Sequence, residues 1–347
     1  MIHFFKTIYL MDYKNFVPKI VIGIVVFLIL LVPVFTQHVV ILSMLIMSGL
    51  WAIAAMGFTL VLRTGQFSLG QAAFMALGGY ASAILTVHLD WPFWPSFFAA
   101  GLISGIIACL IGMVVLRVGG IYFSIITLAL GEIVRIIAQN WEDVTRGSRG
   151  LITSPPPTIP MGFFEINFAA SNVPYFYFTF LLAGITGLIF WRMGESSIGR
   201  AFAGVSLNKD LAEHEGMSLM KYRVIAFTIA GIFTGLAGSL YAHFLSVITP
   251  NVFGLWQSIQ IMIMSIVGGI SSLAGGPVIG AMLLYSLGEY LSRLQTPGLQ
   301  PLLFGGVVVL VLLFLPKGTG MVDLWERFWK KIVWREEDWL GDNDDED

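Results

Sequence analysis

The sequence predicts an all-α fold: a polytopic bundle of about ten transmembrane helices, some of them broken or rich in glycine. Its 347 residues are 57% hydrophobic and 12% charged, whereas a soluble domain carries about a quarter charged residues. The apolar residues also gather in runs long enough to cross a bilayer, which takes about 20 helical residues. A chain of this composition is not expected to stay dispersed in water, so we predict a membrane protein.

The first apolar stretch, Ile20–Phe35, follows Lys6, Lys14 and Lys19 and superficially resembles a secretory signal. It is long for the apolar region of a signal, and no small-x-small cleavage site follows it. We therefore expect a retained first span.

The remaining apolar runs predict nine further spans, separated by short polar or glycine-rich segments. The predicted spans are Ile20–Thr36, Val39–Leu62, Leu69–His88, Pro95–Leu116, Gly120–Ala138, Tyr175–Arg192, Val224–Leu245, Leu255–Ile270, Ala274–Leu291 and Pro301–Leu315. Two interpretations stay open for the glycine-rich segments among them, full crossings or half-spans.

The distribution of Lys and Arg predicts the orientation, because short basic loops are retained in the cytoplasm. With the N-terminus inside, 15 of the 19 Lys and Arg residues lie in cytoplasmic segments. Arg146, Arg149 and Arg293 lie on the opposite side, and Arg135 lies within a span. We therefore predict that both termini are cytoplasmic and that the chain spans the cytoplasmic (inner) membrane.

Hydrophilic segments divide the chain. Gln139–Asn172 is predicted to be an outer-face loop, and Met193–Tyr222 is the one sizeable internal cytoplasmic loop. The segment 317–347 begins basic and aromatic, as expected at a membrane interface, and ends in an acidic run. We therefore expect a transmembrane domain at 1–316, containing the cytoplasmic loop 193–222, and a cytoplasmic tail at 317–347.

The cytoplasmic loop contains a stretch suited to a short helix. Ser206–Glu215 has no helix breaker, and Leu207 and Leu211 would lie on one face at i,i+4. Gly216 would end this helix in a backbone geometry that side chains disfavour, as glycine commonly does just past a helix C-terminus. Such a helix offers a rigid surface to a soluble partner; the alternative is an ordinary solvated loop.

Polar residues near a glycine-rich span are candidates for a substrate path. Gln66, Ser68 and Gln71 lie near the cytoplasmic end of Gly65–Tyr80. Irregular backbone at membrane depth is tolerated where it lines a wet cavity or is buried in protein, and glycines also permit close helix packing. A path and small-residue packing both remain open from the sequence.

Charged residues within spans are a second group of candidates. Glu132 and Arg135, at i,i+3 in an apolar run, are predicted to pair or to face a cavity, because an intramembrane charge is costly. Glu289, near the outer end of a later span, belongs to the same class. The candidate path residues are Gln66, Ser68, Gln71, Thr127, Glu132 and Arg135.

No catalytic or metal site is predicted. Cys109 is the only cysteine, so an intramolecular disulfide and a cysteine-based metal site are both excluded. The five histidines are scattered, whereas metal or acid–base chemistry needs clustered His, Asp or Glu. Gly268–Ala281 lacks the lysine of a phosphate-binding loop, so we predict a tight break between spans there and no ATP hydrolysis by this chain.

Four segments carry a resemblance to a known family. They are Gly65–Tyr80, Gly120–Glu132, the loop residues Ser197–Ala201 with Gly216 and Ala226–Phe227, and Gly268–Ala281. In this order they resemble the Liv-type permease subunit of branched-chain amino acid ABC importers, the LivM-like one of the pair. The cytoplasmic loop resembles the coupling loop by which such permeases dock on their ATPase. By this resemblance the coupling residues are Gly199, Arg200, Leu207, Leu211, Ala212, Glu213 and Gly216.

The resemblance implies a permease of a binding-protein-dependent ABC importer, with branched-chain amino acids as the leading substrates. The implied partners are a paralogous permease subunit, two cytoplasmic ATPase subunits and an extracytoplasmic substrate-binding protein. ATP would be bound by the ATPases, so we expect no cofactor on this chain, and no nucleic-acid partner.

Three alternatives stay open. Similar permeases carry urea and short amides, which would change the substrate and keep the architecture. An ion-coupled secondary transporter would need broken helices and buried ionisable groups at the midplane, and such groups are scarce here. An intramembrane enzyme would need a cluster of reactive side chains that the sequence does not display.

Overall fold

The computed structural model describes residues 31–36, 38–156, 159–161, 164–166, 168, 171–207, 209–270, 272–292, 302, 304–306 and 309. The helices are α2 (Val39–Leu62), α3 (Gln71–His88), α4 (Phe93–Val115), α5 (Ile121–Asn140), α6 (Glu142–Thr145), α7 (Asn172–Glu195), α8 (Ser197–Leu207), α9 (Lys209–His214), α10 (Leu219–Leu245), α11 (Leu255–Gly268) and α12 (Gly275–Ser292). The short 3-10 helices are η1 (Gly147–Arg149) and η2 (Pro250–Phe253), and the strands are β1 (Leu151–Ile152), β2 (Ile159–Met161), β3 (Phe164–Ile166) and β4 (Val247–Ile248).

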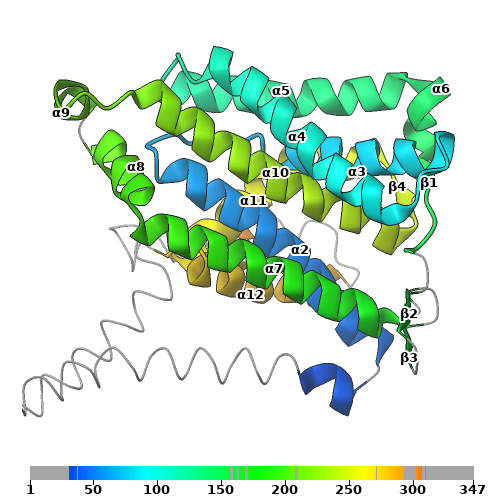
Figure 1. Ribbon diagram of the computed structural model, residues 1–347. Coiled ribbons are helices and arrows are strands. Elements are labelled where there is room, and N and C mark those ends of the chain that lie inside the picture. The colour runs from blue at the N-terminus through cyan, green and yellow to red at the C-terminus, as the bar shows by residue number, and fades with distance from the viewer. Residues whose placement is uncertain are drawn as a thin grey trace, which may run out of the picture.

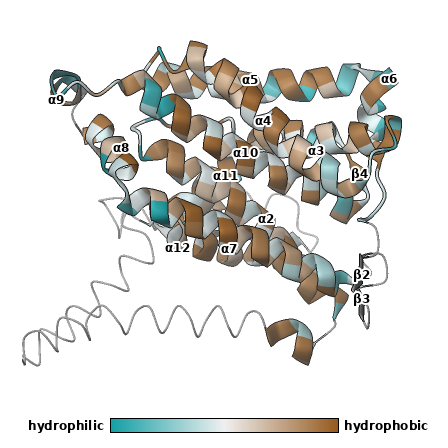
Figure 2. Ribbon diagram, viewed as in Figure 1, coloured by the Kyte–Doolittle hydropathy of each residue, from teal (hydrophilic) through white to brown (hydrophobic). Residues whose placement is uncertain are grey.

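The long helices lie side by side in a bundle with two distinct ends. Helices α8 and α9 lie at one end, and α6 and the short strands lie at the other (Figure 1). Hydrophobic residues run along most of the long helices, and hydrophilic residues gather toward the two ends (Figure 2). The chain is an all-α membrane protein, as the composition predicts.

Eight of the ten predicted spans coincide with α2, α3, α4, α5, α7, α10, α11 and α12. Five of these helices, α2, α4, α5, α7 and α10, are long and apolar enough to cross a membrane. The 24 residues of α2 extend about 36 Å, compared with a hydrocarbon core about 30 Å thick. The first predicted span is described only at residues 31–36 and the last only at 302, 304–306 and 309, and the predicted tail 317–347 lies outside the described residues.

The helix α11 is too short to cross a membrane alone. Its 14 residues rise about 21 Å. It ends at Gly268, and the next residue, Gly269, has a φ of 115°. The predicted break therefore lies between α11 and α12, and α11 is better described as a half-span.

Two helices, α2 and α10, form the centre of the bundle. Helix α2 packs against α7, α10, α11 and α12, and α10 also packs against α3 and α4. The Ser265 hydroxyl of α11 donates a hydrogen bond to the Ala55 carbonyl of α2 at 2.9 Å. The outer helices α4, α5 and α7 instead expose apolar side chains such as Ile106, Ile125 and Leu188, a surface typical of a membrane or protein interface.

Small residues allow α3, α4 and α10 to approach closely. A Cβ on Gly78 of α3 would collide with the backbone of Gly235 in α10. The Ser104 hydroxyl of α4 donates to the carbonyls of Phe74, at 3.2 Å, and Gly231, at 2.9 Å. In this part of the glycine-rich span the structure therefore supports small-residue packing.

The predicted outer loop Gln139–Asn172 contains short elements that the sequence did not signal. Strand β1 pairs antiparallel with β4 beyond α10, and β2 pairs antiparallel with β3. The Thr153 hydroxyl also donates to the Ala242 carbonyl of α10 at 2.8 Å. Strands of two or three residues are too short to leave an alternating pattern, and for this reason the all-α prediction omitted them.

Candidate functional site

The cytoplasmic loop folds into two helices rather than one. The predicted helix Ser206–Glu215 is wrong, because α8 ends at Leu207 and α9 begins at Lys209. Leu207 and Leu211 therefore belong to different helices, and their side chains are 87% and 59% exposed.

Gly216 ends α9 with the left-handed backbone that was predicted, at a φ of +76°. The Met217 N–H donates to the Ala212 carbonyl and the Gly216 N–H donates to the Glu213 carbonyl, both at 2.9 Å. This pair of bonds is a Schellman motif, in which glycine usually takes the left-handed position. Among the described residues, no heavy atom lies within 4 Å of a Cβ built on Gly216, so the backbone conformation alone selects glycine.

The other coupling residues divide into anchored and exposed ones. A Cβ on Gly199 would collide with backbone carbonyls in the last turn of α7. The Arg200 guanidinium donates to the Glu195 carbonyl at 3.1 Å, and Ala212 is buried. Glu213 is exposed. The two short helices are thus fixed to the bundle by Gly199, Arg200 and Ala212 and present Glu213 and the two leucines outward.

A contact with no sequence signal joins α8 to the turn between α2 and α3. A Cβ on Gly65 would lie 3.2 Å from the Cα atom of Ser206. The same turn is bound to α5, because the Leu69 N–H donates to the Thr127 hydroxyl at 3.0 Å. Residues 65–69 therefore touch the candidate coupling element on one side and a candidate path residue on the other.

Arg223, near the start of α10, is a second group that the sequence did not single out. Its side chain is 6% exposed, and the Glu213 carboxylate of α9 attracts it electrostatically. Within the described part of the chain, its Nε and Nη2 atoms have no hydrogen-bond partner. A buried cation beside an exposed carboxylate thus links α9 to the start of the central helix α10.

Four of the six candidate path residues lie around the turn between α2 and α3. Gln66, Ser68, Gln71 and Thr127 are all buried. The Gln71 side-chain carbonyl accepts a hydrogen bond from the Thr234 hydroxyl of α10 at 3.2 Å. Neither polar atom of the Gln66 amide has a partner among the described residues. Because an unsatisfied buried amide is costly, Gln66 is the member of this group most in need of a water or a ligand.

The other two candidates, Glu132 and Arg135, form the predicted ion pair. The Arg135 Nε donates to a Glu132 carboxylate oxygen at 2.8 Å, and its Nη1 donates to the Gln139 amide at 3.0 Å. The Glu132 side chain is 33% exposed and the Arg135 side chain is 24% exposed. They lie about 8–12 Å beyond Thr127 along α5, toward α6. The structure therefore does not bring this pair together with the other four candidates.

Basic residues gather at the end of the bundle that carries α8 and α9. Helix α4 runs antiparallel to α10, with Gly101 against Leu236 and Gly112 against Phe227, so Arg117, two residues after α4, lies near the start of α10. The basic residues that follow, end or begin the long helices at this end are Arg63, Arg117, Arg192, Lys221 and Arg223.

The described residues contain no group of three His, Cys, Asp or Glu side chains that could hold a metal ion. Cys109 is a half-buried free thiol on α4. The absence of a catalytic site and of a cofactor therefore stays a prediction.

Comparison with known proteins identifies relatives. Residues 40–314 match a family described as the permease component of the branched-chain amino acid transport system. The high-affinity branched-chain amino acid transport system permease protein LivM of Salmonella typhimurium is 28% identical over 291 residues, which cover 78% of this chain and 68% of the relative. The LivM protein of Escherichia coli is 28% identical over 288 residues, which cover 78% and 67%.

A more distant relative carries a different substrate in its name. The galactofuranose transporter permease protein YtfT of Escherichia coli is 25% identical over 243 residues, which cover 68% of this chain and 67% of the relative. No solved structure matches the chain.

Proposed function

The chain belongs to the family of permease components of branched-chain amino acid transport systems, and from this premise we propose that it is the substrate-conducting subunit of an ATP-driven importer of branched-chain amino acids. The observation that carries the proposal is the family match, because residues 40–314 include α2, apart from its first residue, and every later helix through α12. The two LivM relatives support the substrate class, since both are named for branched-chain amino acid transport.

In this proposal the chain has about ten membrane segments in the cytoplasmic (inner) membrane, one of them the half-span α11, and both termini lie in the cytoplasm. The end of the bundle with α8 and α9 faces the cytoplasm, and the end with α6 and the short strands faces outward. The gathering of Arg63, Arg117, Arg192 and Arg223 at the first end supports this orientation, because basic loops are retained in the cytoplasm.

The proposed partners are a paralogous permease subunit, two cytoplasmic ATPases and an extracytoplasmic substrate-binding protein. ATP binds to the ATPases, and this chain carries no cofactor. Helices α8 and α9 dock on an ATPase through the exposed side chains of Leu207, Leu211 and Glu213. Exposed apolar residues beside a charge are suited to a docking surface that gives both affinity and orientation.

The contact between Gly65 and Ser206 offers a route from docking to transport. A shift of α8 would press on the turn between α2 and α3, which holds Gln66 and is bound to Thr127 of α5. In the proposed function this turn carries the movement from the ATPase side to the candidate path residues. The route is mechanical, because it consists of packed backbone and one hydrogen bond.

Uptake in proteoliposomes tests the proposal. The complete transporter, with its partner subunits, is reconstituted and supplied with L-leucine, the binding protein and ATP on the side of the ATPases. We expect leucine uptake that requires ATP hydrolysis and that a proton or sodium gradient alone does not drive. Uptake driven by an ion gradient without ATP would support a secondary transporter, and uptake of urea or acetamide in place of leucine would overturn the substrate assignment.

A further inference from the structure

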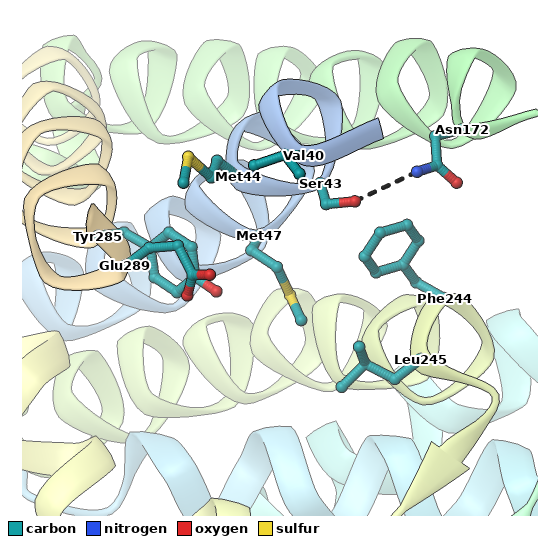
Figure 3. A pocket seen from close by; sticks show the side chains of 9 residues that line it. All are labelled: Val40, Ser43, Met44, Met47, Asn172, Phe244, Leu245, Tyr285 and Glu289. Atoms are coloured by element: carbon teal, nitrogen blue, oxygen red, sulfur yellow. Dashed lines mark hydrogen bonds between the residues drawn. The ribbon is translucent and has the colours of Figure 1, made fainter. Parts of the chain in front are cut away.

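A cavity of about 450 Å³ lies between four helices at the end of the bundle opposite α8 and α9. Its volume falls within the range of about 300–1,000 Å³ that is typical of small-molecule sites. It is formed by the start of α2 and α7 and the end of α10 and α12 (Figure 3). The lining residues are Val40, Ser43, Met44, Met47, Asn172, Phe244, Leu245, Tyr285 and Glu289.

The polar groups of the cavity stand on two sides. Glu289 and Tyr285 come from α12, one helical turn apart, and their side chains lie next to each other (Figure 3). On the other side, the Asn172 amide nitrogen donates a hydrogen bond to the Ser43 hydroxyl at 3.2 Å. An amide nitrogen carries two hydrogens, and a serine that accepts one bond keeps its own O–H. One side thus offers a carboxylate and the other offers hydrogen-bond donors.

The rest of the lining is apolar and adaptable. Met47 of α2 lies between the two polar sides, Met44 lies nearer Tyr285 and Glu289, and Phe244 and Leu245 of α10 lie nearer Asn172 (Figure 3). Methionine side chains fit irregular apolar shapes because they are unbranched and flexible. This part of the cavity suits a branched aliphatic group better than a charged or strongly hydrated one.

We propose that this cavity binds the substrate as a neutral amino acid zwitterion with an apolar side chain, at the outward-facing end of the permease. The Glu289 carboxylate attracts the α-ammonium group, the Asn172 amide and the Ser43 hydroxyl donate to the α-carboxylate, and the methionines with Phe244 receive the side chain. The inference rests on the proposed function for the substrate class. It adds a substrate site within this chain, assigned to residues that were not among the candidate path residues.

The charges also predict which ligands are rejected. An acidic side chain, as in L-glutamate, would be placed in an apolar region and near a carboxylate, and both effects are unfavourable. L-Leucinamide keeps the ammonium group and lacks the carboxylate, and 4-methylpentanoate keeps the carboxylate and lacks the ammonium group. The two analogues therefore report on the two polar sides separately.

Protection of a single cysteine tests the site. Met44→Cys is made in a Cys109→Ala background, and the complete transporter in lipid nanodiscs is treated with a small thiol reagent. We expect L-leucine to slow the labelling at least about fivefold at saturation, and L-glutamate to have no effect. Glu289→Gln should raise the leucine concentration for half-protection about tenfold, as expected for the loss of one charge-assisted hydrogen bond.

Matched variants separate the proposed contacts from general damage. Asn172→Asp, of nearly the same shape, should weaken protection by leucine and by 4-methylpentanoate but spare L-leucinamide. Glu142→Gln, an exposed carboxylate of α6 at the same end of the bundle, should leave protection unchanged.

Three outcomes would overturn the inference: no protection by leucine, protection that Glu289→Gln and Asn172→Asp leave unchanged, or a cysteine at position 44 that never reacts in the complete transporter. ATP-driven uptake is measured on the same preparation. Leucine uptake without protection contradicts this site alone, whereas a parental complex that takes up no leucine contradicts the proposed function.

Discussion

Replacing Gly216 by valine is expected to disable coupling while leaving the membrane domain intact. Gly216 has a φ of +76°, and a Cβ built on it meets no heavy atom of the described residues within 4 Å. The cost of a side chain there is therefore conformational, about 1–3 kcal/mol for a residue other than glycine in this region, and highest for a β-branched side chain. A cost of about 2 kcal/mol lowers the ratio of native to distorted loop roughly 30-fold.

The substitution series ranks the outcomes. Asparagine tolerates the left-handed region, so Gly216→Asn should transport nearly as well as the parent, Gly216→Ala should be intermediate and Gly216→Val should be most impaired. All three should reach the membrane at parental abundance, because the Cβ position is open. The assay is ATP-driven leucine uptake by the reconstituted transporter, together with copurification of the ATPases.

The control is Gly184→Val in α7, where the Cβ position is also open and the glycine has an ordinary helical φ. It should transport normally. If Gly216→Val retains parental uptake with its ATPases bound, α9 and its Schellman motif do not couple ATP hydrolysis to transport.

The remaining predictions concern orientation, the ion pair and helix packing. In a cysteine-free background, Ile152→Cys should react with a membrane-impermeant reagent on intact cells and Ser206→Cys should not; the reverse result would invert the topology. Glu132→Gln should weaken assembly, and the double change with Arg135→Leu should recover part of the loss. The coupling energy should be about 0.5–1 kcal/mol, because both side chains are partly exposed. Stability is measured in detergent, and strictly additive losses would show that the pair is not coupled. Gly78→Ala should lower the free energy of unfolding by about 1–3 kcal/mol, because its methyl group would collide with the backbone of α10. The control is Gly131→Ala, which should not destabilise the protein because no heavy atom of the described residues lies within 4 Å of its Cβ position. Equal effects of the two substitutions would refute the packing argument.

The features that the sequence predicted well are local ones. The bounds predicted for α2 agree with the structure at both ends, because an uninterrupted apolar run lies between His38 and Arg63. The left-handed backbone at Gly216 was predictable for a similar reason, since a Schellman motif involves only six consecutive residues. The pair of Glu132 and Arg135 also lies within one turn of one helix.

The features that it missed depend on residues far apart in the chain. The contact of Gly65 with Ser206 and the pairing of β1 with β4 bring together segments whose relation has no periodic signature. The proximity of Glu213 to Arg223 could not be predicted from the sequence, because the chain turns at Gly216 between them. The cavity draws on four helices, and of its lining only Glu289 stood out in the sequence, as a charge within an apolar run.

The central place of α2 also bears on how the protein is made. Its Ala55 carbonyl accepts a hydrogen bond from Ser265, 210 positions later in the chain. A ribosome that adds about 5–20 residues each second needs roughly 10–40 s to deliver that partner. During this interval the side of α2 that packs against α11 and α12 lacks these partners, and α2 can remain in contact with lipid because no charged side chain lies between Val39 and Leu62. The centre of the finished bundle is therefore among the first parts to be synthesised, and the side of it that faces α11 and α12 is among the last to be enclosed.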